Sequence, residues 1–205
     1  MSEKLDRRKR KTRQQLRLAL IALMKEKGLE KITVSDLTER ADMNRGTFYL
    51  HYQDVPDLFL QVKQEIFDDM SKIMITFDPR EISSYAVEDK PYPKVIKFLT
   101  YIAENKDFFL VIFGPNGDAG FPMQIKAFMT EHLYKKSAFA QLNDSGKALV
   151  PRDYLIAYVS SANLGLITHW LNAGLNLSVE EVALILTRIM HKGPIAITLS
   201  HLTQS

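Results

Sequence analysis

At 205 residues, the chain is long enough for one sizeable hydrophobic core, or for a small module joined to a medium-sized one. The composition, 46% hydrophobic and 25% charged, is that of an ordinary folded protein, and no apolar run approaches the roughly 20 residues that cross a bilayer. The absence of cysteine excludes disulfides, thiolate nucleophiles and cysteine-ligated metal sites. We therefore expect a cytoplasmic protein without membrane contact, metal or cofactor.

Positive charge is concentrated at the N-terminus. The net charge is only +3, yet residues 1–60 carry thirteen Lys and Arg against nine Asp and Glu. Seven of these basic residues fall within the first thirteen positions: Lys4, Arg7, Arg8, Lys9, Arg10, Lys11 and Arg13. A block of like charges repels itself, stays extended and is attracted to polyanions. Considered alone, the same block is equally consistent with a solvated terminus that has no partner.

Apolar spacing predicts a first helix over residues 12–27. Its apolar residues recur at intervals of three and four, which places them on one helical face: Leu16, Ala19, Leu20 and Leu23. Gly28 is expected to end this helix, because glycine adopts the left-handed conformation found at helix C-termini. Thr33, with Asp36 three positions later, predicts the capped start of a second, short helix near Val34.

A third helix is predicted to follow the second after only about three residues. Asn44 is a favourable N-cap for a helix over residues 45–51, and Asp42 tolerates a left-handed position in the turn before it. Two short helices joined by so tight a turn, and packed on a longer helix, have the geometry of a DNA-binding helix-turn-helix.

The remaining sequence predicts an all-α fold without strands. A fourth helix, capped by Asp54 and Asp57, is expected to reach Ile75. The polar stretch 79–93 is expected to form a loop with at most a turn of helix. Shorter helices are predicted near residues 95–102, 107–113 and 125–133, with a turn at 114–117, and two long helices over residues 151–173 and 178–193. Ser178 and Glu181 form a full capping box for the last helix.

The residues from Thr33 to Ala41 and from Asn44 to Tyr52 resemble the signature of the tetracycline-repressor (TetR) family of transcriptional regulators. The resemblance covers about residues 10–60, roughly a quarter of the chain. It is specific, because the Gly-Thr-Phe-Tyr motif lies within the correct order of helix, turn and helix. It implies a three-helix DNA-binding domain with a basic N-terminal arm over residues 1–55, followed by a helical ligand-sensing and dimerisation domain over residues 56–205.

The third helix is expected to read DNA. A helix in the major groove needs small residues where its backbone approaches the duplex, as Gly46 and Thr47 provide, and a donor such as Arg45 for guanine. The resemblance implies that Phe48 packs inward, that Tyr49 and His51 meet mainly the DNA backbone, and that Thr33 touches a phosphate. The resulting DNA-contact set is Thr33, Arg45, Gly46, Thr47, Tyr49, Leu50, His51 and Lys11.

Two positions depart from the family pattern. Val55 stands where members commonly have a phosphate-binding lysine, and Asp42 replaces the usual glycine of the turn. The basic arm of Lys9, Arg10 and Lys11 is hypothesised to offset the missing contact by following the DNA backbone or entering the minor groove. We do not expect His51 to bind metal, because no second ligand occurs at helical spacing.

The second domain contains polar residues within apolar helices, and these are candidates for effector binding because a buried polar group needs partners. Together with nearby aromatic residues, the effector-binding candidates are Phe98, Phe128, His132, Asn163, His169 and Trp170. For the aromatic residues, core packing is the favoured alternative. For the polar residues, satisfied polarity within the core or a hydrogen bond across a dimer interface is slightly favoured over ligand contact.

Homodimerisation through the last two long helices is the expected assembly. Residues 158–165 contain small side chains that permit close helix approach, and the resemblance implies that the last two helices form half of an intermolecular four-helix bundle. A two-fold dimer places its reading helices about 34–36 Å apart and therefore binds a palindromic operator. In the family, an effector changes that separation by shifting the fourth helix.

A repressor of transcription controlled by a small molecule is the favoured interpretation, and two alternatives stay open. A helix-turn-helix regulator controlled by a protein partner would use the aromatic-rich region 108–128 as an exposed docking surface. An enzyme is less well supported, because the sequence contains no Ser-His-Asp arrangement in turn context, no paired-carboxylate cluster and no phosphate-binding glycine loop.

Overall fold

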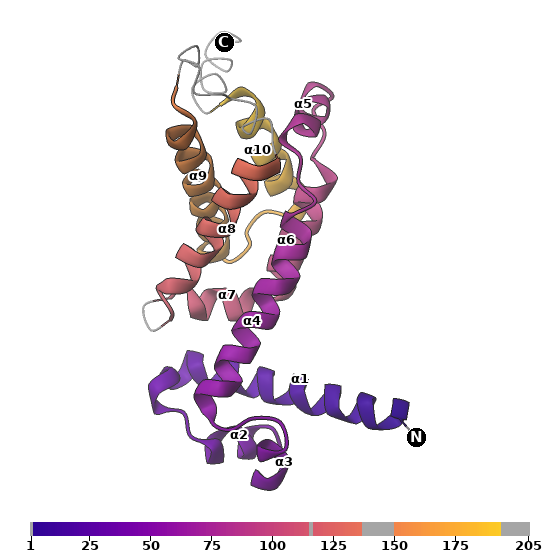
Figure 1. The fold of residues 1–205 in the computed structure, drawn as a ribbon, viewed down its shortest axis with the longest axis vertical. Helices are drawn as coiled ribbons and strands as arrows, with labels where there is room; N and C mark the ends of the chain where they lie inside the picture. The colour runs from indigo at the N-terminus through magenta and orange to yellow at the C-terminus, as the bar shows by residue number, and fades with distance from the viewer. Residues whose placement is uncertain (1, 115–116, 137–149, 194–205) are drawn as a thin grey trace. The chain divides into compact units, whose positions relative to one another are not determined.

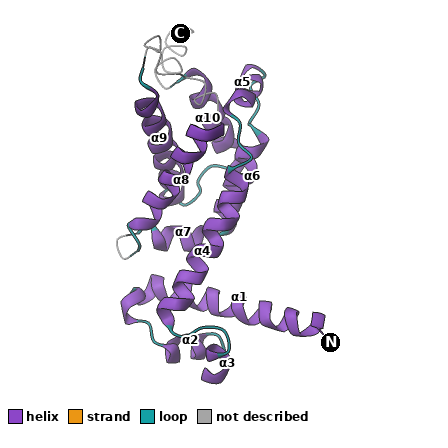
Figure 2. Cartoon of the chain, in the orientation of Figure 1, coloured by secondary structure: helices purple, strands orange, loops and turns teal. Residues whose placement is uncertain are grey.

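The structure is a computed structural model that describes residues 2–114, 117–136 and 150–193. Within these ranges every regular element is helical, from α1 to α10 with one short 3-10 turn, as Figure 2 shows. The all-α expectation is therefore confirmed. None of the described helices is long and apolar enough to span a bilayer. The chain divides into a first unit, Met1–Asp68 with Asp107–Ala119, and a second unit, Asp69–Lys106 with Gly120–Ser205.

In the first unit, α1 (Ser2–Lys27) begins ten residues before the predicted start at residue 12, so the expectation of an extended basic block is wrong. Lys, Arg and Gln are strong helix formers, and neither Gly nor Pro occurs before Gly28. Leu16 and Leu20 are fully buried and form the inner face of α1.

The end of α1 and the start of α2 are fixed by local signals, as predicted. Gly28 has a φ of 77°, and its N–H donates to the Met24 carbonyl at 3.0 Å. After the 3-10 turn η1 (Leu29–Lys31), α2 (Val34–Arg40) begins with a complete capping box. The Thr33 Oγ1 accepts a hydrogen bond from the Asp36 N–H at 3.2 Å, and the Asp36 carboxylate accepts one from the Thr33 N–H at 2.7 Å.

The turn before α3 (Arg45–Tyr49) has the predicted chemistry. Asp42 occupies the left-handed region with a φ of 50°, and the Asn44 Oδ1 accepts a hydrogen bond from the Thr47 N–H at 2.8 Å. The helix ends at Tyr49, two residues before the expected end. Figure 1 shows α2 and α3 lying together beside α1.

The helix α4 (Val55–Met74) supplies residues to both units. Its start is capped as expected, because the Asp54 Oδ1 accepts a hydrogen bond from the Asp57 N–H at 2.8 Å. Val55, the position that departs from the family pattern, is buried.

The helix α7 (Lys106–Ile112) and the loop after it complete the first unit. Phe108 and Phe109 are buried, and the Asp118 N–H donates to the Ile112 carbonyl at 3.0 Å. A Cβ at Gly117 would lie 2.1 Å from the same carbonyl, so this close approach requires glycine. Two residues of the expected turn, 115 and 116, lie outside the described residues.

In the second unit, the expectation of a loop over residues 79–93 is wrong for its first half, which forms α5 (Pro79–Val87). The Asp78 side chain caps the helix by accepting a hydrogen bond from the Arg80 N–H, and a proline opens the first turn, where it needs no N–H. Ile82 and Ala86, one turn apart, are buried. Only these two residues form the buried face of α5, so the apolar pattern was too short to predict this helix.

The core of the second unit is formed by α6 (Pro93–Glu104), α8 (Gly120–Lys136), α9 (Arg152–Asn172) and α10 (Val179–Lys192). α10 packs against α5 and α6, and α8 packs against α9. The capping box of Ser178 and Glu181 starts α10 and Gly193 ends it, as predicted.

Candidate nucleic-acid interface

The helix α3 presents one face to the protein and the opposite face to solvent. Phe48 is fully buried, which confirms the expected inward packing. Arg45 and Gly46 are exposed, Tyr49 is 57% exposed and Leu50, just after the helix, is 83% exposed. A leucine and a tyrosine left in water beside an arginine and a glycine form a surface suited to a macromolecular partner.

Aromatic packing and one arginine hold α3 in place. The Phe48 ring lies 5.5 Å from the Tyr49 ring and 5.8 Å from the Tyr52 ring. The Tyr52 hydroxyl accepts a hydrogen bond from the Arg13 Nε at 3.3 Å, although Tyr52 itself is only 4% exposed. Arg13 also forms an ion pair with Glu65 on α4. This arginine therefore joins α1, the residues after α3 and α4 in one contact.

Sequence analysis counted Arg13 only as part of the basic block and missed this contact. The residues it joins are separated by 39 and 52 positions in the chain. Helical spacing connects residues three or four positions apart, so no local pattern could have paired them.

His51 lies at the edge of this surface and is half-buried. Burial lowers the pKa of its imidazole below the ordinary 6.5, and the nearby charges of Arg13 and Lys9 lower it further. The ring is therefore neutral at neutral pH. A neutral imidazole still carries one N–H, which can donate to a phosphate oxygen.

The hydroxyl of Thr33 already has a donor role within the capping box. It donates its hydrogen to the Asp36 Oδ2 at 2.7 Å. Hydrogen bonds from Lys27 and Thr33 lower the pKa of Asp36 to about 2, so this carboxylate stays ionised at neutral pH. A phosphate contact from the Thr33 hydroxyl thus requires its hydrogen to rotate away from Asp36.

Residues 17–62 match the family of bacterial regulatory proteins named tetR, and residues 89–192 match a family described as a transcriptional regulator C-terminal region of the same group. The chain belongs to the TetR family. This confirms the expected class, a helix-turn-helix transcriptional regulator and not an enzyme.

A curated relative of this TetR-family protein is the uncharacterized HTH-type transcriptional regulator YxbF of Bacillus subtilis, 28% identical over 98 residues. The match covers 48% of this chain and 25% of YxbF, so the similarity spans only a quarter of that relative's length.

Solved structures of TetR-family regulators share the fold. A TetR transcriptional regulator from Streptococcus agalactiae 2603V superposes with a TM-score of 0.58 at 21% identity, covering 93% of this chain and 99% of the other. DhaS, a dihydroxyacetone kinase operon activator, gives 0.55 at 18% identity over 87% and 93% of the two chains. NalD, the secondary repressor of the MexAB-OprM efflux pump of Pseudomonas aeruginosa, gives 0.53 at 14% identity over 90% and 96%.

In the second unit of the TetR-family protein, two of the effector-binding candidates meet at Phe77. The Phe98 ring stands edge-on to the Phe77 ring at 5.9 Å, and the His132 Nε2 lies 3.2 Å from the Phe77 carbonyl oxygen. Trp170 is buried elsewhere, and its indole N–H donates to the Leu177 carbonyl at 2.9 Å. These contacts are sufficient to account for the burial of Phe98 and Trp170 as core residues.

The other three candidates differ in their exposure. Phe128 and Asn163 are half-buried, whereas His169 is exposed on α9. The assignment of all six residues to an effector site stays a prediction.

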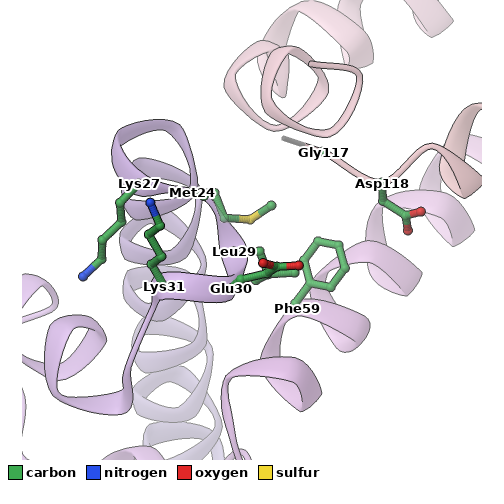
Figure 3. Close-up of a pocket in the computed structure, with 9 residues that line it drawn as sticks. Met24, Lys27, Leu29, Glu30, Lys31, Phe59, Gly117 and Asp118 are labelled. Atoms are coloured by element: carbon green, nitrogen blue, oxygen red, sulfur yellow. The ribbon is translucent and has the colours of Figure 1, made fainter. Parts of the chain in front are cut away.

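A cleft of about 540 Å³ lies in the first unit, away from α3 (Figure 3). Its lining residues are Met24, Lys27, Gly28, Leu29, Glu30, Lys31, Phe59, Gly117 and Asp118. Met24 and Phe59 are buried apolar members of this lining, which also includes two lysines and the carboxylates of Glu30 and Asp118. Sequence analysis missed this cleft because three segments distant in the chain form it.

Proposed function

We propose that the chain is a homodimeric, sequence-specific repressor that binds a palindromic operator through α3 and is controlled by a small molecule bound in the second unit. The proposal rests chiefly on the solvent-facing side of α3, where Tyr49 and Leu50 are 57% and 83% exposed while Phe48 is fully buried. These side chains lie on the same exposed face as Arg45 and Gly46, and a DNA groove would cover them.

Gly46 supports a close approach of DNA. A Cβ at this position would meet only the Asn44 Oδ1, at an ordinary contact distance of 3.4 Å, so the fold does not require glycine here. Glycine within a helix costs roughly 1 kcal/mol relative to alanine. A partner that must approach the backbone of α3 accounts for this cost, and Arg45 in the same first turn is available for a guanine.

Exposed residues on α9 support dimerisation. Tyr154 and Tyr158, one turn apart, are 69% and 53% exposed, and Ser161 and Gly165 continue the same face. A Cβ at Gly165 would have no neighbour within 4 Å, so packing within one chain does not require this glycine either. A second copy of α9 would bury the tyrosines and use the small residues for close helix contact.

Burial of the aromatic residues favours a small molecule over a protein as the controlling partner. Phe108, Phe109 and Phe121, which fall within the alternative docking region, are each at most 2% exposed. Side chains so deeply buried do not offer a docking surface. The half-buried His132 and Asn163 are instead polar groups that a ligand within the second unit would contact.

The test is a footprint of the purified protein on the DNA that flanks its own gene, combined with the mass of the complex. We expect a protected palindrome with two protomers bound. Arg45→Ala should relax base preference within each half-site, whereas Arg80→Ala, which removes the same charge from the second unit, should leave the footprint unchanged. A strictly monomeric protein, or one that ignores duplex DNA even at low salt, would contradict the proposal.

The direction of regulation is tested with a reporter gene under the protected sequence. Repression requires higher reporter output when the regulator gene is deleted. Lower output would instead indicate an activator, the role that the name of the structurally similar DhaS describes for that protein.

A further inference from the structure

The N-terminal part of α1 extends the helix beyond its apolar face. The first buried apolar residue of α1 whose side chain is described is Leu16, and the five basic residues from Arg7 to Lys11 are all exposed. We call residues 7–13 the basic extension. It spans nearly two helical turns, so its side chains project in fixed and different directions.

Lys9 belongs to the same side of α1 as the buried core. Lys9, Arg13, Leu16 and Leu20 are spaced by four, three and four residues, the spacing of a single helical stripe. Arg13 in this stripe bonds to Tyr52, directly after His51. The charge of Lys9 also acts on His51, which is consistent with a position beside the end of α3.

Arg7 projects in nearly the opposite direction. It precedes Lys9 by two residues, which corresponds to a rotation of about 200° around the helix. Lys9 and Arg7 therefore carry the same charge on the same exposed helical extension but face different sides.

We propose that the basic extension is a rigid helical addition to the DNA interface, in which the Lys9 ammonium binds a backbone phosphate beside the sequence read by α3. This inference rests on the proposed DNA-binding function. Arg13 is the positioning residue of this arrangement, because its guanidinium is engaged by Tyr52, Gln61 and Glu65. Lys9, one turn further out on the same stripe, is exposed and available to a phosphate.

A rigid helix and a flexible arm make different predictions. An extended arm could reach the minor groove whatever the conformation of the residues that connect it to the domain. A helical extension depends on an unbroken α1. Thr12 lies at the junction, and its side chain donates to the Arg8 carbonyl at 3.1 Å.

The experiment measures affinity for the footprinted operator at several salt concentrations for the wild type, Lys9→Ala and Arg7→Ala. Each phosphate contact contributes about 0.9 to the slope of log K against log salt. We expect Lys9→Ala to weaken binding several-fold at low salt and to lower the slope by about 1, so that its deficit shrinks about four-fold between roughly 50 and 200 mM salt. Arg7→Ala should change both quantities much less. Equal effects of the two substitutions would overturn the inference.

A second pair of variants tests rigidity without changing charge. Thr12→Pro removes a helical hydrogen bond and kinks α1 outside the core, whereas Thr12→Ala keeps the helix. We expect Thr12→Pro to weaken operator binding as Lys9→Ala does, with Thr12→Ala close to wild type. Wild-type affinity of Thr12→Pro, with its helix break confirmed by circular dichroism, would overturn the inference. If the wild-type protein binds no DNA, both the proposed function and this inference are contradicted.

Discussion

The Nζ of Lys63 on α4 lies 2.8 Å from the Oδ2 of Asp118, so an ion pair holds the loop after α7 to α4 within the first unit. The two side chains are only 21% and 28% exposed, which makes solvent screening weaker than at an open surface. The Lys63 Nζ also lies 5.5 Å from the centre of the ring of Phe59, one of the residues that line the cleft.

Loss of this ion pair should destabilise the protein. Asp118→Asn is expected to lower the free energy of unfolding by roughly 1 kcal/mol, because a partly buried lysine loses its counter-charge. Urea denaturation measures the change. Asp69→Asn is the matched control, since Asp69 pairs with a lysine that is 72% exposed and should contribute little. An equal decrease in the free energy of unfolding for both variants would show that the ion pair of Lys63 with Asp118 does not hold the loop.

Gly117→Ala should destabilise the protein more than the addition of a single methyl group usually does. The new methyl group would lie 2.1 Å from the Ile112 carbonyl oxygen, so the loop backbone must move. We expect a loss of roughly 1–3 kcal/mol, typical of an overpacked site, measured as a lower thermal midpoint. Ser83→Ala, an exposed change on α5, is the control. If Gly117→Ala is as stable as the wild type, the close approach of residue 117 to the Ile112 carbonyl is contradicted.

Substitutions at two adjacent aromatic residues should affect different properties, one the stability of the protein and the other its binding to DNA. Phe48→Ala removes a fully buried ring and is expected to cost about 3–5 kcal/mol of stability. Tyr49→Ala, at a residue 57% exposed, should change stability little and weaken operator binding. Denaturation and operator titration of both variants check this division. A stable Phe48→Ala, or a Tyr49→Ala that binds like wild type, would contradict the assigned faces of α3.

Operator affinity should rise as the medium becomes acidic. His51 has a pKa below 6.5 because of burial and the charges of Arg13 and Lys9, so it is neutral at pH 7 and becomes protonated only at lower pH than an ordinary histidine. Protonation adds a positive charge on the side proposed to face phosphates and should tighten binding as the pH falls below 6.5.

The same change in pH should weaken folding. The unfolded chain binds this proton at the ordinary pKa of 6.5, before the folded chain does, so acid favours unfolding. Affinity titrations between about pH 8 and 5.5 are compared with those of His51→Gln. His191→Gln, an exposed change on α10, serves as control. An identical pH profile for wild type and His51→Gln would remove His51 from the DNA interface.

Local capping chemistry explains why much of the fold could be predicted from the sequence. Thr33, Asn44 and Ser178 each bond to a backbone N–H three residues ahead, so the pattern that indicates the helix start is also the contact that stabilises it. The inward position of Phe48 was implied by the family resemblance. The family resemblance then gave meaning to the exposed residues around it.

Contacts between distant parts of the chain could not be predicted in this way. The bond of Arg13 to Tyr52 and the ion pair of Lys63 with Asp118 span 39 and 55 positions, and neither leaves a periodic pattern in the sequence. Sequence analysis also treated the basic block as an isolated charge cluster. Its helical form follows from backbone propensity, which like-charge repulsion did not overcome.

Residues 107–119 belong to the first unit, although the chain enters the second unit after Asp68 and returns only at Asp107. A fragment truncated at residue 68 would therefore lose the buried Phe108 and Phe109 and the carboxylate that neutralises Lys63. Exchanging DNA-binding units between regulators of this type therefore requires the transfer of two separate segments of the chain. A fusion at a single junction would leave a cavity in the core of the transferred unit.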